Sequence, residues 1–336
     1  MNAKYLTTLA VLAAISVAAT AWVLRSSAPT VVSDRRGETV IPSLMAKANE
    51  ITGLTVRDGT DTLAIERRDN HFVASDSGYP IKTDAVRDVI ASSAELSLEE
   101  VRTSDPARYG DLGLADPGAK DAGKEITFRT AAGELASFVV GNTDPTVGGA
   151  TGGIFIRLKG QPQTFLARGN VRLPSGGRSG WFVPFDLDIK RNEIMKIELV
   201  GGGRDGVTVT ANAEKPGEFT LADVPEKRTA DTFKVGRFAT LIEGFTFNDV
   251  RKATKPADDA RRMVVEAGEG LHVVLTAVGD PTEGWLQITV EAKSDAAKDK
   301  AKLIASKVEG YDFRVPSYQV EMFGWTMNDL TNEQKS

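Results

Sequence analysis

Few residues of this 336-residue chain have the types and spacing that catalysis or metal binding requires. The chain has no cysteine, which excludes thiol nucleophiles, thiolate zinc sites and disulfides. Its two histidines, His71 and His272, lie in separate predicted strands, and neither the G-x-S-x-G nor the H-E-x-x-H motif occurs. We therefore predict no catalytic residue, no metal site and no cofactor. A hydrolase whose two carboxylates come together from distant segments stays open.

Two glycine-rich segments resemble nucleotide-binding loops but have the wrong surroundings. Residues 201–206 (GGGRDG) fit G-x-G-x-x-G, yet the alternating run VTVTAN follows where a dinucleotide site needs a helix. Residues 118–124 (GAKDAGK) begin like a phosphate-binding loop, but Glu125 stands where Ser or Thr must hold magnesium. We interpret the first as a hairpin connection and the second as a flexible loop.

The elements that would position any site are mostly strands, and they occur twice. Asn49-Glu50-Ile51 and Asn192-Glu193-Ile194 each begin an alternating strand, and each is followed by a turn and a second alternating run. Both copies continue with a short strand centred on an aromatic residue, a proline-containing turn, a helix and another strand. The matching positions are Phe72 and Phe219, Asp84 and Asp231 at the helix starts, and Val101 and Val250.

This pattern predicts the α+β class, with two similar domains of antiparallel sheet plus helix that arise from an internal duplication. The predicted domains cover residues 49–189 and 190–336, and an N-terminal transmembrane helix precedes them. Beyond Arg25 the chain carries 39 basic and 46 acidic residues, a net charge of −7. Such a surface does not attract phosphate backbones, so we expect no nucleic-acid partner.

The N-terminus contains a segment suited to the membrane. Residues 6–24 carry no charge, and as a helix they span about 28 Å, close to the thickness of the hydrocarbon core. We favour an uncleaved anchor, with the bulk of the chain extracytoplasmic and the localisation a single pass of the inner membrane. The alternative is a signal peptide cut after Ala21. Residues 25–48 are polar and contain two prolines, so we predict a tether.

Residues 104–117 (SDPARYGDLGLADP) carry a more specific pattern. With the anchor, Gly78-Tyr79-Pro80 and Ser179-Gly180-Trp181, they resemble domain-of-unknown-function family 4340. The resemblance implies a structural motif and an accessory role beside ABC transporters of the gliding-motility type, and it supplies no active-site residue. The X-Pro steps and Gly113 would fix a compact turn that leucines pin to the sheet. The motif residues are Asp105, Pro106, Tyr109, Leu112, Gly113, Leu114, Asp116 and Pro117.

Two further segments are candidate contact surfaces. The glycine-rich loop 141–153 contains Asp144, and the aromatic stretch 311–325 contains Phe323 and Trp325. The chain is predicted to be a membrane-anchored extracytoplasmic accessory or scaffold protein and not an enzyme, and the resemblance implies that its partners are components of an ABC transporter. The alternative is an anchored periplasmic binding module for a small molecule or an envelope polymer.

Overall fold

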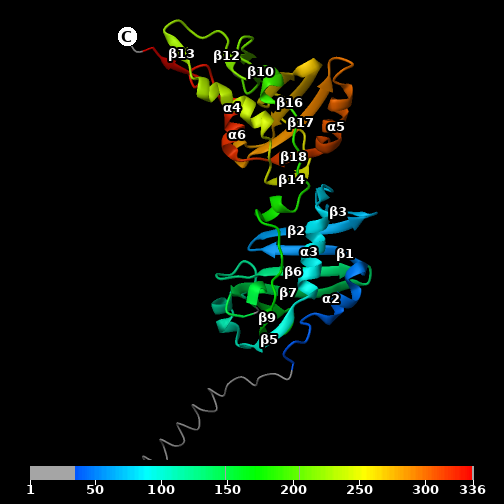
Figure 1. The fold of residues 1–336 in the computed structure, drawn as a ribbon. Coiled ribbons are helices and arrows are strands. Elements are labelled where there is room, and N and C mark those ends of the chain that lie inside the picture. The colour runs from blue at the N-terminus through cyan, green and yellow to red at the C-terminus, as the bar shows by residue number, and fades with distance from the viewer. Residues whose placement is uncertain (1–34, 148, 204, 335–336) are drawn as a thin grey trace, which may run out of the picture. The chain divides into compact units, whose positions relative to one another are not determined.

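The computed structural model describes residues 35–147, 149–203 and 205–334 (Figure 1). The predicted anchor at 6–24 and its alternative cleavage point after Ala21 lie outside the described residues. Within those residues, no helix is both long and apolar enough to cross a bilayer.

The chain has the predicted α+β composition, built on two large antiparallel sheets. The first sheet has nine strands in the order β4-β3-β2-β1-β6-β7-β8-β9-β5. Its strands are β1 (Ile51–Asp58), β2 (Asp61–Arg68), β3 (His71–Ala74), β4 (Pro80–Ile81), β5 (Ser97–Val101), β6 (Lys124–Thr130), β7 (Gly133–Asp144), β8 (Gly153–Leu158) and β9 (Thr164–Arg168). The helices in this part of the chain are α2 (Pro42–Lys47) and α3 (Thr83–Ala94), with short 3-10 turns η1 (Ala48–Glu50), η2 (Pro106–Arg108), η3 (Gly110–Leu112) and η4 (Gly149–Thr151).

The second sheet has eight strands in the order β12-β11-β10-β15-β16-β17-β18-β14. Its strands are β10 (Ile194–Val200), β11 (Val207–Ala211), β12 (Phe219–Leu221), β14 (Asp249–Lys252), β15 (Arg262–Ala267), β16 (Leu271–Ala277), β17 (Trp285–Ala292) and β18 (Tyr311–Arg314). The other elements are β13 (Arg228–Ala230), which pairs with β19 (Thr331–Glu333), α4 (Thr232–Glu243), α5 (Lys298–Val308), α6 (Ser317–Glu321), and the 3-10 turns η5 (Gly177–Gly180), η6 (Arg191–Glu193), η7 (Gly268–Gly270), η8 (Pro281–Glu283) and η9 (Met322–Gly324).

The two sheets repeat one strand order. Eight strands of the first sheet, β3-β2-β1-β6-β7-β8-β9-β5, correspond by position in the chain to the eight strands of the second. A 3-10 turn precedes β1 and another precedes β10, and an irregularity of register follows Ile51 in β1 and Ile194 in β10. The second half adds a helix, α5, between β17 and β18, where the first half has only a short turn between β8 and β9.

Phe72 and Phe219, which the sequence pattern matches, lie in strands at corresponding places of the two sheets, β3 and β12, but they are not equally buried. Phe72 is buried in β3, whereas Phe219 is half-buried in β12. The difference follows from position, because β3 has β4 as an outer neighbour and β12 ends its sheet. Asp231 caps α4, as predicted, by accepting a hydrogen bond from the Lys234 backbone at 3.1 Å.

The chain folds into two compact units, and each unit is made of two separate stretches of the sequence. One unit contains residues up to Leu63 together with Val86–Leu173, and the other contains Ala64–Ala85 together with Pro174–Ser336. The boundaries proposed from the duplication, 49–189 and 190–336, follow the repeat of elements and stay a prediction.

Part of the predicted tether is folded. Gly37 donates a backbone hydrogen bond to the Leu98 carbonyl at 2.7 Å, and Val40 donates one to the Leu96 carbonyl at 2.9 Å. The Leu44 side chain, in helix α2, is fully buried. The tether prediction is therefore wrong for residues 37–48, because their apolar side chains join the core of the first unit.

Candidate functional site

The loop at 104–117 is a small packed structure on the first sheet. The Asp105 carboxylate accepts a hydrogen bond from the Ala107 backbone at 3.0 Å and so caps the turn η2. Tyr109 and Leu114 are buried against Val139 of β7, and Leu112 and Phe155 pack at the edge of this cluster. The leucines therefore pin the turn to the sheet, as the sequence predicts.

Two glycines outside the motif let the loop approach the sheet. A Cβ at Gly141 would lie 2.3 Å from the Leu112 carbonyl oxygen, and one at Gly123 would lie 2.6 Å from the Gly113 carbonyl oxygen. Gly113 has φ of 66°, in the left-handed region that favours glycine. Sequence reasoning identified Gly113 and missed Gly123 and Gly141, which no local turn pattern marks.

Arg157 of β8 clamps the loop from the side. Its guanidinium lies 4.7 Å from the centre of the Tyr109 ring, donates to the Leu114 carbonyl at 3.2 Å and forms an ion pair with Asp116. Only 12% of the Arg157 side chain is exposed. The Tyr109 hydroxyl donates to the Pro162 carbonyl at 2.6 Å. The polar groups of the motif are thus used to hold the loop in place.

A hollow of about 250 Å³ lies beside this loop, lined by Glu100, Val101, Arg102, Thr103, Arg108, Asp111 and Leu112. Arg102 pairs with Glu100 at 3.0 Å, and Arg108 lies 3.7 Å from Asp111. Each arginine therefore has its own carboxylate, and the hollow offers little net charge to an ionic ligand.

Asp144, the predicted contact residue of loop 141–153, is engaged by its own turn. Its carboxylate accepts hydrogen bonds from the Thr146 hydroxyl at 2.6 Å and the Thr146 backbone at 2.9 Å. These bonds hold the pKa of Asp144 below its usual value. The carboxylate organises the loop, and a contact role for Asp144 stays a prediction.

The predicted aromatic surface at the C-terminus is partly core. Phe323 is only 3% exposed, so the structure corrects its assignment to a contact surface: its apolar ring is buried within the fold. Trp325 is half-buried, packing edge-on against Phe238 at 5.7 Å with the Arg237 guanidinium 5.2 Å from its ring. The same arginine lies 5.5 Å from the ring of Tyr318, which is 53% exposed.

The structure brings together two other family-like segments, Gly78-Tyr79-Pro80 and Ser179-Gly180-Trp181. The Lys82 backbone donates to the Trp181 carbonyl at 2.8 Å, and the Val183 backbone donates to the Pro80 carbonyl at 3.0 Å. The Tyr79 hydroxyl donates to the Val183 carbonyl at 3.0 Å. Burial, with a smaller contribution from Tyr311, raises the pKa of Tyr79. Sequence reasoning missed this pairing because about 100 residues separate the two segments.

The remaining candidates for chemistry stay apart. His71 is exposed at the start of β3, and His272 is half-buried in β16 between Glu266 of β15 and Glu291 of β17. Across residues 35–334, leaving out 148 and 204, no group of three or more histidine, cysteine or acidic residues could hold a metal ion. Residues 201–206 connect β10 to β11, and residues 118–124 lead into β6, as predicted.

Comparison with known proteins gives one match. No curated protein and no solved structure matches the chain. Residues 72–262 match the model of a family described as a domain of unknown function, DUF4340. The match contains the loop at 104–117, both paired segments and the start of the second sheet. Because it covers more than half of the 336 residues, the chain belongs to the DUF4340 family.

Proposed function

We propose that this protein is a membrane-anchored extracytoplasmic accessory protein that assists an ABC-type transport complex through protein–protein contact. The observation that carries the proposal is the uncharged segment 6–24 a short distance before a folded body. Packing begins at Gly37, so only residues 25–36 separate the two. A stretch of this length reaches at most about 43 Å even when fully extended. The body would therefore stay near the bilayer and meet membrane partners at high local concentration.

The roles of the family-like residues support contact over catalysis. Tyr79, Leu114 and Trp181 are all buried, and each holds backbone segments together or packs against a sheet. Residues with such roles preserve a shape, which is what a scaffold offers to its partners. We infer on this basis that the body turns over no substrate.

We also infer that the two sheets arose by internal duplication. The support is the repeated order of eight strands together with the matching 3-10 turns and register irregularities before and within β1 and β10. Two copies of a sheet scaffold give two sets of edges and loops, which can diverge independently to contact different partners.

Anchoring can be tested by fractionation. The full chain should stay with membranes after a high-salt wash and keep its N-terminus, while a chain that lacks residues 1–24 should not. A mature protein that begins at Trp22 and is found in the soluble fraction would show that the segment is a cleaved signal.

The contact role can be tested by purification in a mild detergent. Subunits of an ABC transporter should be recovered with the tagged full chain and identified by mass spectrometry. The matched control is the same body exported from a cleavable signal, which should recover less. If the exported body restored function fully and recovered no partner, a periplasmic binding module would be the better description.

A further inference from the structure

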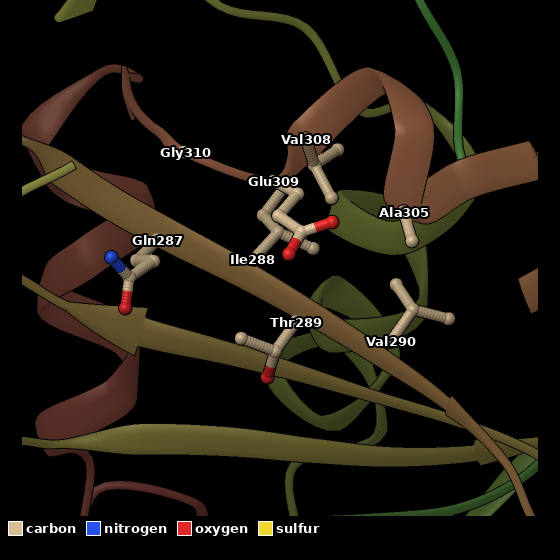
Figure 2. Close-up of a pocket in the computed structure, with 8 residues that line it drawn as sticks. All are labelled: Gln287, Ile288, Thr289, Val290, Ala305, Val308, Glu309 and Gly310. Carbon is tan, nitrogen blue, oxygen red and sulfur yellow. The ribbon is translucent and has the colours of Figure 1, made fainter. Parts of the chain in front are cut away.

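A hollow of about 350 Å³ lies between β17 and the end of α5 in the second unit (Figure 2). The strand contributes residues 287–290, and the helix end and following turn contribute Ala305 and residues 308–310. The size falls at the lower end of the ~300–1,000 Å³ typical of ligand sites.

The hollow lies where the pairing between β17 and β18 stops after a few residues. In the first sheet β9 pairs with β8 across five residue pairs, from Gly153 to Arg157. In the second sheet β18 pairs with β17 across only three, from Trp285 to Gln287. Helix α5 is inserted at this point, and it packs over β17 and β16. The chain therefore turns away from β17 where the first sheet continues to pair.

Beyond its pairing with β18, the strand β17 has backbone N–H and C=O groups that point toward the hollow. Lys293 donates to the Gly270 carbonyl and Val278 donates to the Trp285 carbonyl, so the odd-numbered residues of β17 bond to β16. Val315 donates to the Gly284 carbonyl, which places the even-numbered residues on the β18 side. In this register Tyr311, the first residue of β18, lies opposite Ile288, so it is the N–H and C=O groups of Val290 and Ala292 that face the side on which β18 no longer pairs with β17. Such an edge is a template for another strand.

The hollow also selects side chains. Val290, Ala305 and Val308 give it small aliphatic walls. Figure 2 shows the Glu309 carboxylate among these residues, and within the described part of the chain it has no ion pair or side-chain hydrogen bond. An unpaired carboxylate beside a free strand edge favours a cationic side chain on the added strand.

We propose that this edge binds an extended, basic peptide segment of a partner protein by strand addition along Val290–Ala292. Backbone hydrogen bonds to β17 would give affinity, and a lysine or arginine beside Glu309 would give selectivity. The inference rests on the proposed contact function, and it specifies the kind of partner segment that one contact surface would bind.

The test uses the full chain in detergent and a labelled peptide of sequence Thr-Lys-Val-Lys-Val-Lys-Thr, which alternates basic and small aliphatic residues. Fluorescence anisotropy should show saturable binding. Replacement of the lysines by glutamates, or N-methylation of the central valines, should weaken binding about tenfold or more, because each removes charge pairing or backbone donors. Equal binding of the N-methylated peptide would overturn the inference.

Variants of the chain locate the site. Glu309→Lys should weaken binding about tenfold or more, whereas the same charge change at the exposed Glu226, between β12 and β13, should not. Ala305→Trp should fill the hollow and so weaken peptide binding without any change of charge. Absence of peptide binding while transporter subunits still co-purify would overturn this inference alone. Peptide binding without any recovered membrane partner would support the edge and overturn the proposed transport role.

Discussion

Tyr79 offers the sharpest test of how the second unit is held together. It is 3% exposed, and its ring makes edge-to-face contacts with Phe182, Phe247, Tyr311 and Phe313 at centroid distances of 5.0–5.8 Å. Its hydroxyl bonds to the Val183 carbonyl. We predict that two substitutions at this residue separate the two contributions, since Tyr79→Phe removes only the hydrogen bond and Tyr79→Ala removes the ring as well.

The expected costs differ clearly. Tyr79→Phe should lower the free energy of unfolding by about 1–2 kcal/mol, because the hydrogen bond to the Val183 carbonyl is lost. Tyr79→Ala should cost about 4–5 kcal/mol, near the top of the range for truncating a buried aromatic residue, because four aromatic contacts are lost together. Denaturant unfolding of the full chain in one detergent, followed by near-ultraviolet circular dichroism, measures both.

The same residue predicts a dependence on alkaline pH. Because its pKa is raised in the folded chain, the unfolded chain deprotonates first as pH rises above about 10. The tyrosine contribution is therefore complete below pH 10 and is lost above it, at about 1.4 kcal/mol per pH unit. Tyr79→Phe should remove this slope. Equal costs for the two substitutions, or an unchanged alkaline slope in Tyr79→Phe, would refute the account of Tyr79 as the centre of the aromatic cluster.

Three other substitutions test the packing described above. Gly141→Ala should lower the free energy of unfolding by about 1–3 kcal/mol, because the added Cβ pushes the 104–117 loop away from the sheet. Gly110→Ala should cost far less, because its Cβ would meet nothing closer than 3.7 Å. Thermal unfolding of the two variants measures the difference. Hydrogen bonds from Arg36 and then Arg168 lower the pKa of Glu99, so Glu99→Gln should cost about 1–2 kcal/mol at pH 7. That cost should disappear as pH falls through the folded pKa, and a cost that persists at pH 2–3 would argue against charge pairing. Trp325→Ala should cost about 1–3 kcal/mol through its contacts with Phe238 and Arg237, and it should reduce recovery of membrane partners at temperatures where the fold persists.

Local sequence patterns predicted where strands and helices occur, but they did not predict which strands pair with each other. The alternation in residues 51–56 and 195–200 marks strands that the structure contains, and Asp231 caps its helix as expected. The strand order was beyond such patterns, because pairing of β1 with β6 or of β5 with β9 depends on contacts between distant residues.

The misses share a physical cause. Residues 37–48 contain one proline and several polar residues and so resemble a linker, but a few apolar side chains such as Leu44 suffice to fold them onto the core. Phe323 lies in an aromatic stretch whose buried and exposed faces cannot be told apart by composition. Gly123 and Gly141 must be glycine because the loop at 104–117 packs closely against them. The residues next to them in the sequence give no sign of that contact.

The interleaved course of the chain has a consequence for its synthesis. The segment Ala64–Ala85 belongs to the second unit, yet the chain then supplies Val86–Leu173 to the first before it returns. The Tyr311 hydroxyl that bonds to the Gly78 carbonyl at 3.5 Å lies 233 residues further along the chain. During synthesis from the N-terminus, Tyr311 and Phe313, two of the four aromatic partners of Tyr79, therefore appear only when almost the whole chain has been made. A chain truncated at residue 189 would leave that ring without most of its packing, so this fold is completed from its last strands and not one domain at a time.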